Sequence, residues 1–299
     1  MAEREISLGA EKALATDVSL AARFVQKHLI RTIEDAGIWT DEGWMSYNTN
    51  PGSGYSLHIE HGGRFPDAVW ETPKARREYY ALNLSLEKRF SHGWQGGLNY
   101  TLSRATGNYG GLSSTDENGR NSPNVTCYFD SWFGPYDIRG NLLHGPLPQD
   151  RTHYLKLYGS CRLRFGLTVG LTAFATSGYP LTTTLAINDG SMYPNNRADL
   201  GRLPFTAWGN IYLEYTLRLA GRTRASVNLQ IDNFTNTKAW QDKVTEVNLD
   251  TMYVSDEEIV SGSFDWRAAL PDYLPNPMFG MYSTRFKTWT ARLGFRLAF

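Results

Sequence analysis

Alternation of apolar and polar residues along this chain predicts strands. In the last segment, the odd positions from Trp289 to Phe299 are apolar, and the even positions from Thr288 to Ala298 are polar or small. A period of two puts successive side chains on opposite faces of a strand. A segment of about ten residues with one apolar face is long enough for a tilted transmembrane strand. A half-buried strand of a soluble sandwich has the same pattern, so this segment leaves both interpretations open.

Eight earlier segments alternate in the same way and group into four hairpins. They are residues 6–14 with 18–24, 80–87 with 96–103, 155–163 with 167–174, and 210–219 with 226–232. Short turns lie within the hairpins and long loops lie between them, an asymmetry that transmembrane barrels show. The sequence therefore predicts an all-β fold, an antiparallel transmembrane β-barrel segment of about nine strands. We expect an open or partial barrel with short periplasmic turns and long extracellular loops.

The first hairpin has a competing interpretation. Residues 10–36 are rich in helix formers, and Leu20, Phe24 and His28 recur at helical spacing. Alternation alone therefore leaves both a strand pair and a helix open for this region.

Seven charged residues fall in the polar rows of the predicted strands. A charge at the lipid midplane costs about 2 to 4 kcal/mol, so in a barrel these residues must face the lumen. In a soluble sandwich they would form the solvated face, so the orientation depends on the barrel. The residues are Lys156, Arg162, Glu214, Arg218, Asp232, Arg292 and Arg296.

Composition narrows the class of protein. The chain has 299 residues, a formal net charge of zero and 20% charged residues, and its mean hydropathy is −0.42. A barrel is compatible with this value because half of each membrane strand faces water. Charge balance argues against general nucleic-acid binding. The start MAEREISLGAEKAL has early acids and no apolar core, so we do not expect a secretory signal there.

Several separated motifs carry a family resemblance. They are REYYALNLSLEKRFSHGWQGGLNYTLSRATGNYGGL (77–112), GPLPQDRTHYLKLYGS (145–160), FATSGYP (174–180), LQIDNFTNT (229–237) and the last strand ending in Phe299. The chain resembles the C-terminal barrel of Oar-like TonB-dependent outer-membrane receptors. RTIEDAG (31–37) and NPGSG (50–54) fit the same family, and they favour a strand pair for the N-terminal region.

The resemblance implies a bacterial outer-membrane location and substrate uptake driven by a TonB-type energy-coupling protein. It also implies contact with outer-membrane lipid, a barrel-assembly machinery that recognises Phe299, and an unknown small-molecule or peptide substrate. Such receptors close about 22 strands around a plug. We therefore expect residues 1–299 to be the C-terminal part of such a barrel, lacking the signal peptide, plug domain and earlier strands, and to act in uptake only within the full-length protein.

Two groups of loop residues are candidate sites. An aromatic and acidic group could contact a sugar or siderophore, or could instead pack a long loop against itself; it comprises Asp130, Trp132, Phe133, Tyr136 and Asp137. His58, Glu60 and His61 have suitable chemistry for a metal, but their spacing differs from that of helical zinc motifs. We predict no metal site.

Nothing in the sequence indicates an enzyme. Cys127 and Cys161 form no recognisable disulfide or zinc framework, and no phosphate loop, nucleophile elbow or Ser, His, Asp triad is evident. No cofactor is expected. Two alternatives remain open: a self-contained outer-membrane pore or adhesin that completes itself by oligomerising, and a soluble carbohydrate-binding β-sandwich.

Overall fold

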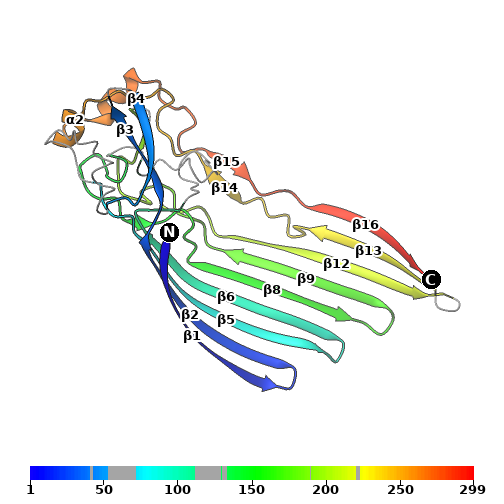
Figure 1. Cartoon of the computed structure of the whole chain (residues 1–299). Helices are drawn as coiled ribbons and strands as arrows, with labels where there is room; N and C mark the ends of the chain where they lie inside the picture. The colour runs from blue at the N-terminus through cyan, green and yellow to red at the C-terminus, as the bar shows by residue number, and fades with distance from the viewer. Residues whose placement is uncertain (41–42, 53–71, 112–128, 130–132, 189, 220–222) are drawn as a thin grey trace.

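The fold is dominated by one antiparallel sheet with nine long strands (Figure 1). The structure is a computed structural model of the chain, and it describes residues 1–40, 43–52, 72–111, 129, 133–188, 190–219 and 223–299. Consecutive long strands are neighbours throughout, as the order β1-β2-β5-β6-β8-β9-β12-β13-β16 shows. The strands are β1 Ala2–Ala15, β2 Val18–Arg31, β5 Arg77–Ser91, β6 Trp94–Gly107, β8 His153–Arg162, β9 Leu167–Thr176, β12 Thr206–Arg218, β13 Arg224–Asp232 and β16 Thr290–Ala298.

The nine predicted strands are confirmed, including the disputed first pair. Residues 2–15 and 18–31 are β1 and β2 and form an antiparallel pair with register shifts only near its two ends, so the helical alternative is wrong there. Short turns close the hairpins at one end of the sheet, whereas the long connections gather at the other (Figure 1). Gly166, at φ 96°, closes the turn between β8 and β9 in a conformation that favours glycine.

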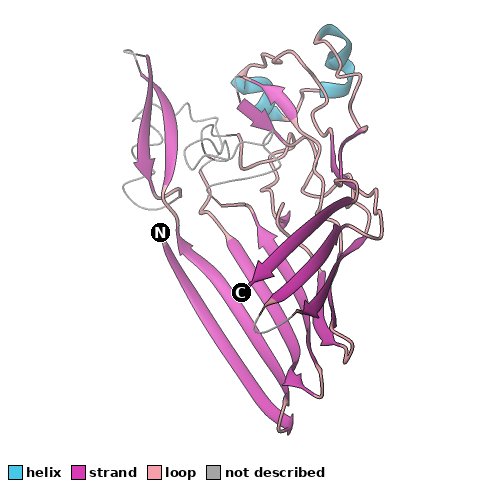
Figure 2. Cartoon of the chain, turned by 90° about the vertical axis from the view of Figure 1, so that its right-hand side faces the viewer, coloured by secondary structure: helices cyan, strands magenta, loops and turns pink. Residues whose placement is uncertain are grey.

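One face of the sheet is apolar and open. The register places Leu86, Leu98 and Leu157 directly opposite one another on β5, β6 and β8. Their exposed fractions are 38%, 37% and 39%, and that of Leu293 on β16 is 79%. The nine long strands form a single curved layer, and no second layer of described residues covers this face (Figure 2). The β-sandwich alternative is therefore wrong.

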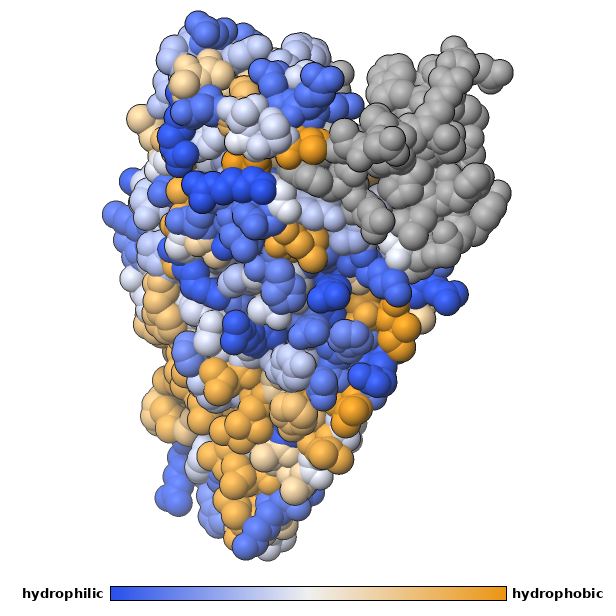
Figure 3. Space-filling view, turned by 90° about the vertical axis from the view of Figure 1, so that its left-hand side faces the viewer, coloured by the Kyte–Doolittle hydropathy of each residue, from blue (hydrophilic) through white to orange (hydrophobic). Residues whose placement is uncertain are grey.

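The long connections fold into a cap at one end of the sheet. Figure 3 shows apolar side chains gathered over the sheet and a mostly hydrophilic surface over the cap. Short elements build this cap, with its helices seen in Figure 2. They are β3 Glu34–Thr40, β4 Gly43–Thr49, β10 Leu185–Ile187, β11 Gly190–Met192, β14 Trp240–Lys243, α2 Asp256–Ser261, α3 Trp266–Ala269, η1 Leu270–Asp272 and β15 Tyr282–Arg285, whereas the short β7 Gly145–Pro146 pairs with β6 in the large sheet.

The cap contains the main hydrophobic core of the described residues. Its largest cluster joins residues from three long connections: Phe133, Ile138, Ile187, Met192, Met252, Val254 and Ile259. Of these, Ile187, Met192, Met252 and Ile259 are fully buried. Buried asparagines replace missing backbone partners: Asn248 accepts from the Ala186 amide at 3.0 Å and donates to the Ala186 carbonyl at 2.8 Å. The cap is thus packed like a soluble protein.

None of the helices in the described residues is long and apolar enough to span a membrane.

An ionic contact joins the first two hairpin turns. Asp17 lies 3.0 Å from the ammonium of Lys88 and accepts a hydrogen bond from the Ser91 hydroxyl. The Lys88 ammonium also donates to that hydroxyl at 2.6 Å and lies 4.3 Å from the centre of the Trp94 ring. The hydrogen bonds from Ser91 and Lys88 lower the pKa of Asp17 from 3.8 to about 2.

Asp17→Asn should reduce stability only while Asp17 is ionised in the folded protein. Because the folded pKa of about 2 lies below the ordinary value of 3.8, the carboxylate stabilises the fold fully above about pH 4. That contribution is lost as the pH falls towards 2. Thermal unfolding of both proteins in detergent, followed by tryptophan fluorescence across this range, should show converging midpoints. Midpoints that stay equally far apart at pH 2 would contradict the assignment.

Candidate functional site: the polar face of the sheet

The face opposite the apolar one carries a continuous polar surface. One row runs across five strands through directly opposed residues: Glu87, Gly97, Tyr158, Thr172 and Asn210. Directly opposed side chains share a face of an antiparallel pair. The polar surface is therefore built by the strand register rather than by any single loop.

A tyrosine and a carboxylate interact across an intervening strand. The Tyr158 hydroxyl on β8 lies 2.6 Å from both carboxylate oxygens of Glu87 on β5, to which it donates. Its ring passes over Gly97 of β6, where a Cβ would lie 2.5 Å from Tyr158 Cζ. The missing side chain at Gly97 is what allows this contact, which fixes three strands relative to one another.

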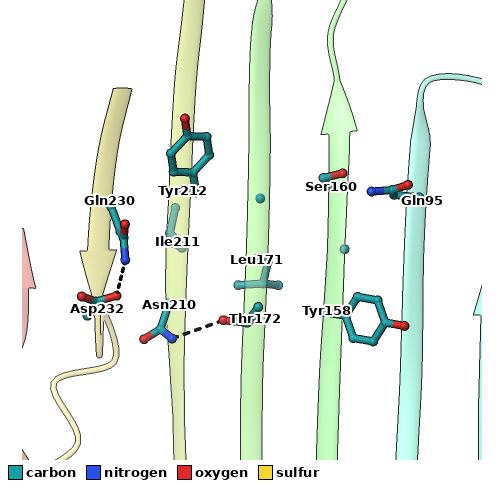
Figure 4. A pocket seen from close by; sticks show the side chains of 12 residues that line it. Gln95, Tyr158, Ser160, Leu171, Thr172, Asn210, Ile211, Tyr212, Gln230 and Asp232 are labelled. Atoms are coloured by element: carbon teal, nitrogen blue, oxygen red, sulfur yellow. Dashed lines mark hydrogen bonds between the residues drawn. The ribbon is translucent and has the colours of Figure 1, made fainter. Parts of the chain in front are cut away.

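Part of this row, with Tyr158, Thr172 and Asn210, lines a depression of about 400 Å³ (Figure 4). Asn210 donates to the Thr172 hydroxyl at 3.2 Å, and Gln230 donates to Asp232 at 2.9 Å. Tyr212 also lines the depression. Amides, hydroxyls and one carboxylate can exchange hydrogen bonds with water or a polar solute, so this surface suits the wall of an aqueous pathway.

All seven charged residues of the sequence prediction lie on this polar face, because each shares its parity with the polar rows in the register. Asp232 and Arg292 form an ion pair at 3.1 Å. Glu214 accepts from the Tyr212 hydroxyl at 2.7 Å. That this face lines a lumen stays a prediction.

An aromatic cluster on the polar face, near the cap, escaped the sequence analysis. Phe174 stacks on Trp208 with ring centres 5.0 Å apart, and Trp208 contacts Phe286 at 4.9 Å. A depression of about 410 Å³ adjoins it, lined also by Tyr179 and Trp240. Phe174 and Trp208 are aromatic residues at polar positions of the alternation. These two aromatic residues in the polar rows were the feature of the sequence that could have indicated the cluster.

Three of the five loop residues proposed as substrate contacts lie in the described part of the chain, and they pack within the cap. Phe133 is only 3% exposed in the cap core, and Asp137 is 7% exposed. Asp137 accepts from the backbone amides of Arg139 and Asn141, both at 2.9 Å. Tyr136 forms an antiparallel bridge with Leu142 nearby. Loop packing accounts for these contacts, and a role in binding substrate stays a prediction.

Other candidates lie outside the described residues or at the end of the chain. Asp130, Trp132, Cys127 and the group His58, Glu60 and His61 lie in the undescribed segments. Within the described part of the chain, no group of three or more His, Cys, Asp or Glu residues could hold a metal. Phe299 is 98% exposed at the short-turn end of β16.

The family motifs form the junctions between sheet and cap. Asp150, with its side chain 2% exposed, accepts from the Ala105 amide at 2.6 Å and pairs with Arg202. Asn233 bonds to the carbonyls of Thr237 and Lys287 at 3.1 and 2.8 Å. Burial raises the pKa of Tyr179 to about 12, so its hydroxyl stays protonated and donates to the Gln241 carbonyl.

The comparisons define the class of protein. Residues 4–252 match the outer membrane beta-barrel domain family. The chain belongs to that family. It is 33% identical over 181 residues to the TonB-dependent transporter Oar of Myxococcus xanthus, a match that covers 59% of this chain and 15% of Oar.

A solved outer-membrane transporter structure has the same fold. The outer-membrane transporter YddB of Escherichia coli superimposes with a TM-score of 0.54 at 13% identity, over 81% of this chain and 30% of YddB. The siderophore receptor PiuA of Acinetobacter baumannii gives a TM-score of 0.47 at 10% identity, over 99% of this chain and 28% of PiuA. The chain is thus a TonB-dependent-transporter-like barrel of the bacterial outer membrane, and its relative Oar is a transporter. The chain spans less than a third of the length of Oar, of YddB and of PiuA.

Gly97→Ala should break the contact between Tyr158 and Glu87. The new Cβ would lie 2.5 Å from Tyr158 Cζ and 2.6 Å from a Glu87 carboxylate oxygen, so the ring must move away. We expect the free energy of unfolding to fall by about 1 to 3 kcal/mol, measured by urea titration of the full-length protein in detergent.

Gly9→Ala is the matched control, because its Cβ would make an ordinary contact of 3.4 Å with the Ala22 carbonyl. Tyr158→Phe should cost a similar amount, and adding it to Gly97→Ala should cost little more because both changes remove one interaction. Fully additive losses would show that the hydroxyl and the glycine act separately.

Proposed function

We propose that this chain is the C-terminal part of the barrel of a TonB-dependent outer-membrane transporter, and that its polar face lines the substrate pathway. The observation that carries the proposal is the division of the sheet into an exposed apolar face and a continuous polar face. In a membrane, the apolar face suits lipid and the charged rows suit the lumen. The kinship with Oar supports transport as the activity.

Energetics support a role within a larger barrel. In the described residues, β1 and β16 each have a neighbour on one side only. Unpaired backbone groups in hydrocarbon cost several kcal/mol each, whereas a domain is stable by only about 5 to 15 kcal/mol. Further strands must pair with both edges. We infer that they come from the same protein, with a plug, a TonB-type partner and assembly machinery acting on the whole.

Under this proposal, the short turns face the periplasm and the cap faces the outside. A substrate would meet the cap first, then the aromatic cluster around Trp208, and then the polar rows beneath it. The candidate loop residues Phe133, Tyr136 and Asp137 would contribute through the shape of the cap.

Adjacent substitutions on β9 should distinguish the two faces. Leu171 belongs to the apolar rows and Thr172 to the polar rows. Leu171→Arg should lower the free energy of unfolding by about 2 to 4 kcal/mol in lipid, and Thr172→Arg by less than about 1 kcal/mol. Urea titration of the full-length protein in lipid vesicles measures both. Equal losses would contradict the assignment of the polar face to the lumen.

Uptake should require an energised partner. We would compare strains that express or lack the full-length protein, with and without the TonB-type inner-membrane protein, and follow depletion of solutes from a complex medium by mass spectrometry. The expected result is a set of solutes depleted only when both proteins are present. Depletion that persists without the partner would instead support the alternative of a passive pore.

A further inference from the structure

Five arginines surround a hollow at the short-turn end of the polar face. The hollow has a volume of about 710 Å³ and is also lined by Glu214, Thr216 and Ser226. The arginines come from β8, the following turn, β12, β13 and β16, and we call them the arginine basin: Arg162, Arg164, Arg218, Arg224 and Arg296. Arg162, Arg218 and Arg224 are terminal residues of their strands beside the short turns, at the end of the sheet away from the cap (Figure 1).

The strand register forces these charges together. Arg218 of β12 stands directly opposite Arg224 of β13, and like charges in that position destabilise a strand pair. Arg296 on β16 stands opposite Ser226, the next polar position along β13. Such an arrangement works against folding unless something compensates the charge.

Compensation from the described residues is small. Glu214 is the only carboxylate among the residues that line the hollow. Its oxygens already accept from the Tyr212 hydroxyl at 2.7 Å and from the Thr216 hydroxyl at 3.4 Å. In the described part of the chain, none of the five arginines takes part in an ion pair. The basin therefore keeps a strong excess of positive charge.

The backbone beneath the basin is held in place. The Thr216 amide donates to the Gly166 carbonyl at 3.0 Å, which ties the turn carrying Arg164 to β12. The hydroxyls of Thr216 and Ser226 lie 3.1 Å apart and bridge β12 to β13. Because these contacts fix the strands and the turn, the arginines converge without any rearrangement of the backbone.

We infer that the arginine basin binds a ligand with two or more oxyanion groups, either phosphates or carboxylates. Guanidinium groups form paired hydrogen bonds with both anions, and a hollow lined by one sign of charge concentrates the opposite sign. Its volume falls in the range of about 300 to 1,000 Å³ typical of small-ligand sites. The source is either a small polyanion in solution or an acidic peptide segment, and the two share this chemistry.

The inference goes beyond the proposed transport function. The basin lies at the opposite end of the polar face from the cap and the aromatic cluster, so it is separate from the surface that a substrate would meet first. The inference rests on the charge of the basin, on the strand register and on the fixed backbone beneath it. It does not depend on whether uptake needs an energised partner.

The test compares Arg218→Gln/Arg224→Gln with the native full-length protein in detergent at low salt. The probes are tripolyphosphate and a hexaglutamate peptide, each set against sodium chloride of equal ionic strength. One probe or both should raise the unfolding temperature of the native protein, and calorimetric affinity should fall at least tenfold in the variant. Without a probe, the variant should unfold at the same or a higher temperature, because the repulsion is removed.

Arg4→Gln/Arg31→Gln is the control, since both arginines are exposed outside the basin and the net charge changes equally. Protection by tripolyphosphate identifies a free polyanion as sufficient, and protection by hexaglutamate alone identifies an acidic segment. No protection beyond the salt control, or an equal loss of affinity in the control variant, would overturn the inference.

Discussion

Backbone hydrogen bonding is the constraint on which the rest of this structure depends. Hydrocarbon offers no partner for an amide or a carbonyl, so a strand in a membrane must pair with strands on both sides. Eight consecutive antiparallel pairings meet this demand from β1 to β16. Once pairing is fixed, the period of two assigns every side chain to a face. The apolar rows through Leu98 and Leu157 and the polar rows through Tyr158 and Thr172 are consequences of that one register.

The sheet and the cap use apolar side chains in opposite ways. Leu293 and Phe295 on β16 are 79% and 69% exposed, whereas Ile187, Met252 and Ile259 in the cap are fully buried. The difference follows from the solvent that each part meets, since hydrophobic burial stabilises only a part that would otherwise touch water. The contacts of Asp150 and Asn233 join the sheet to the cap.

The structure could be predicted from the sequence where apolar and polar residues alternate regularly. It could not be predicted in segments that have no such period. Each long strand has a regular alternation, and so β12 and β13 could be placed with their charged rows. The pairing of β14 with β15 brings Trp240 opposite Arg285 across a long stretch of chain, and neither segment has a period. Asp137 was a candidate for substrate contact and no pattern marked Asn248, yet both are buried and bound to backbone groups. The arginine basin needs the register of several strands, so no single segment indicates it.

The unequal lengths of the connections bear on how such a chain reaches its place in the bilayer. Tight reversals such as Thr16 with Asp17 carry few polar groups, whereas the longer segments that form the cap carry many. In the proposed orientation, with the cap outside, these polar segments have to cross the bilayer before the cap can pack. Because the cluster around Met252 draws on three of those segments, the cap core can pack completely only once all three segments are in place.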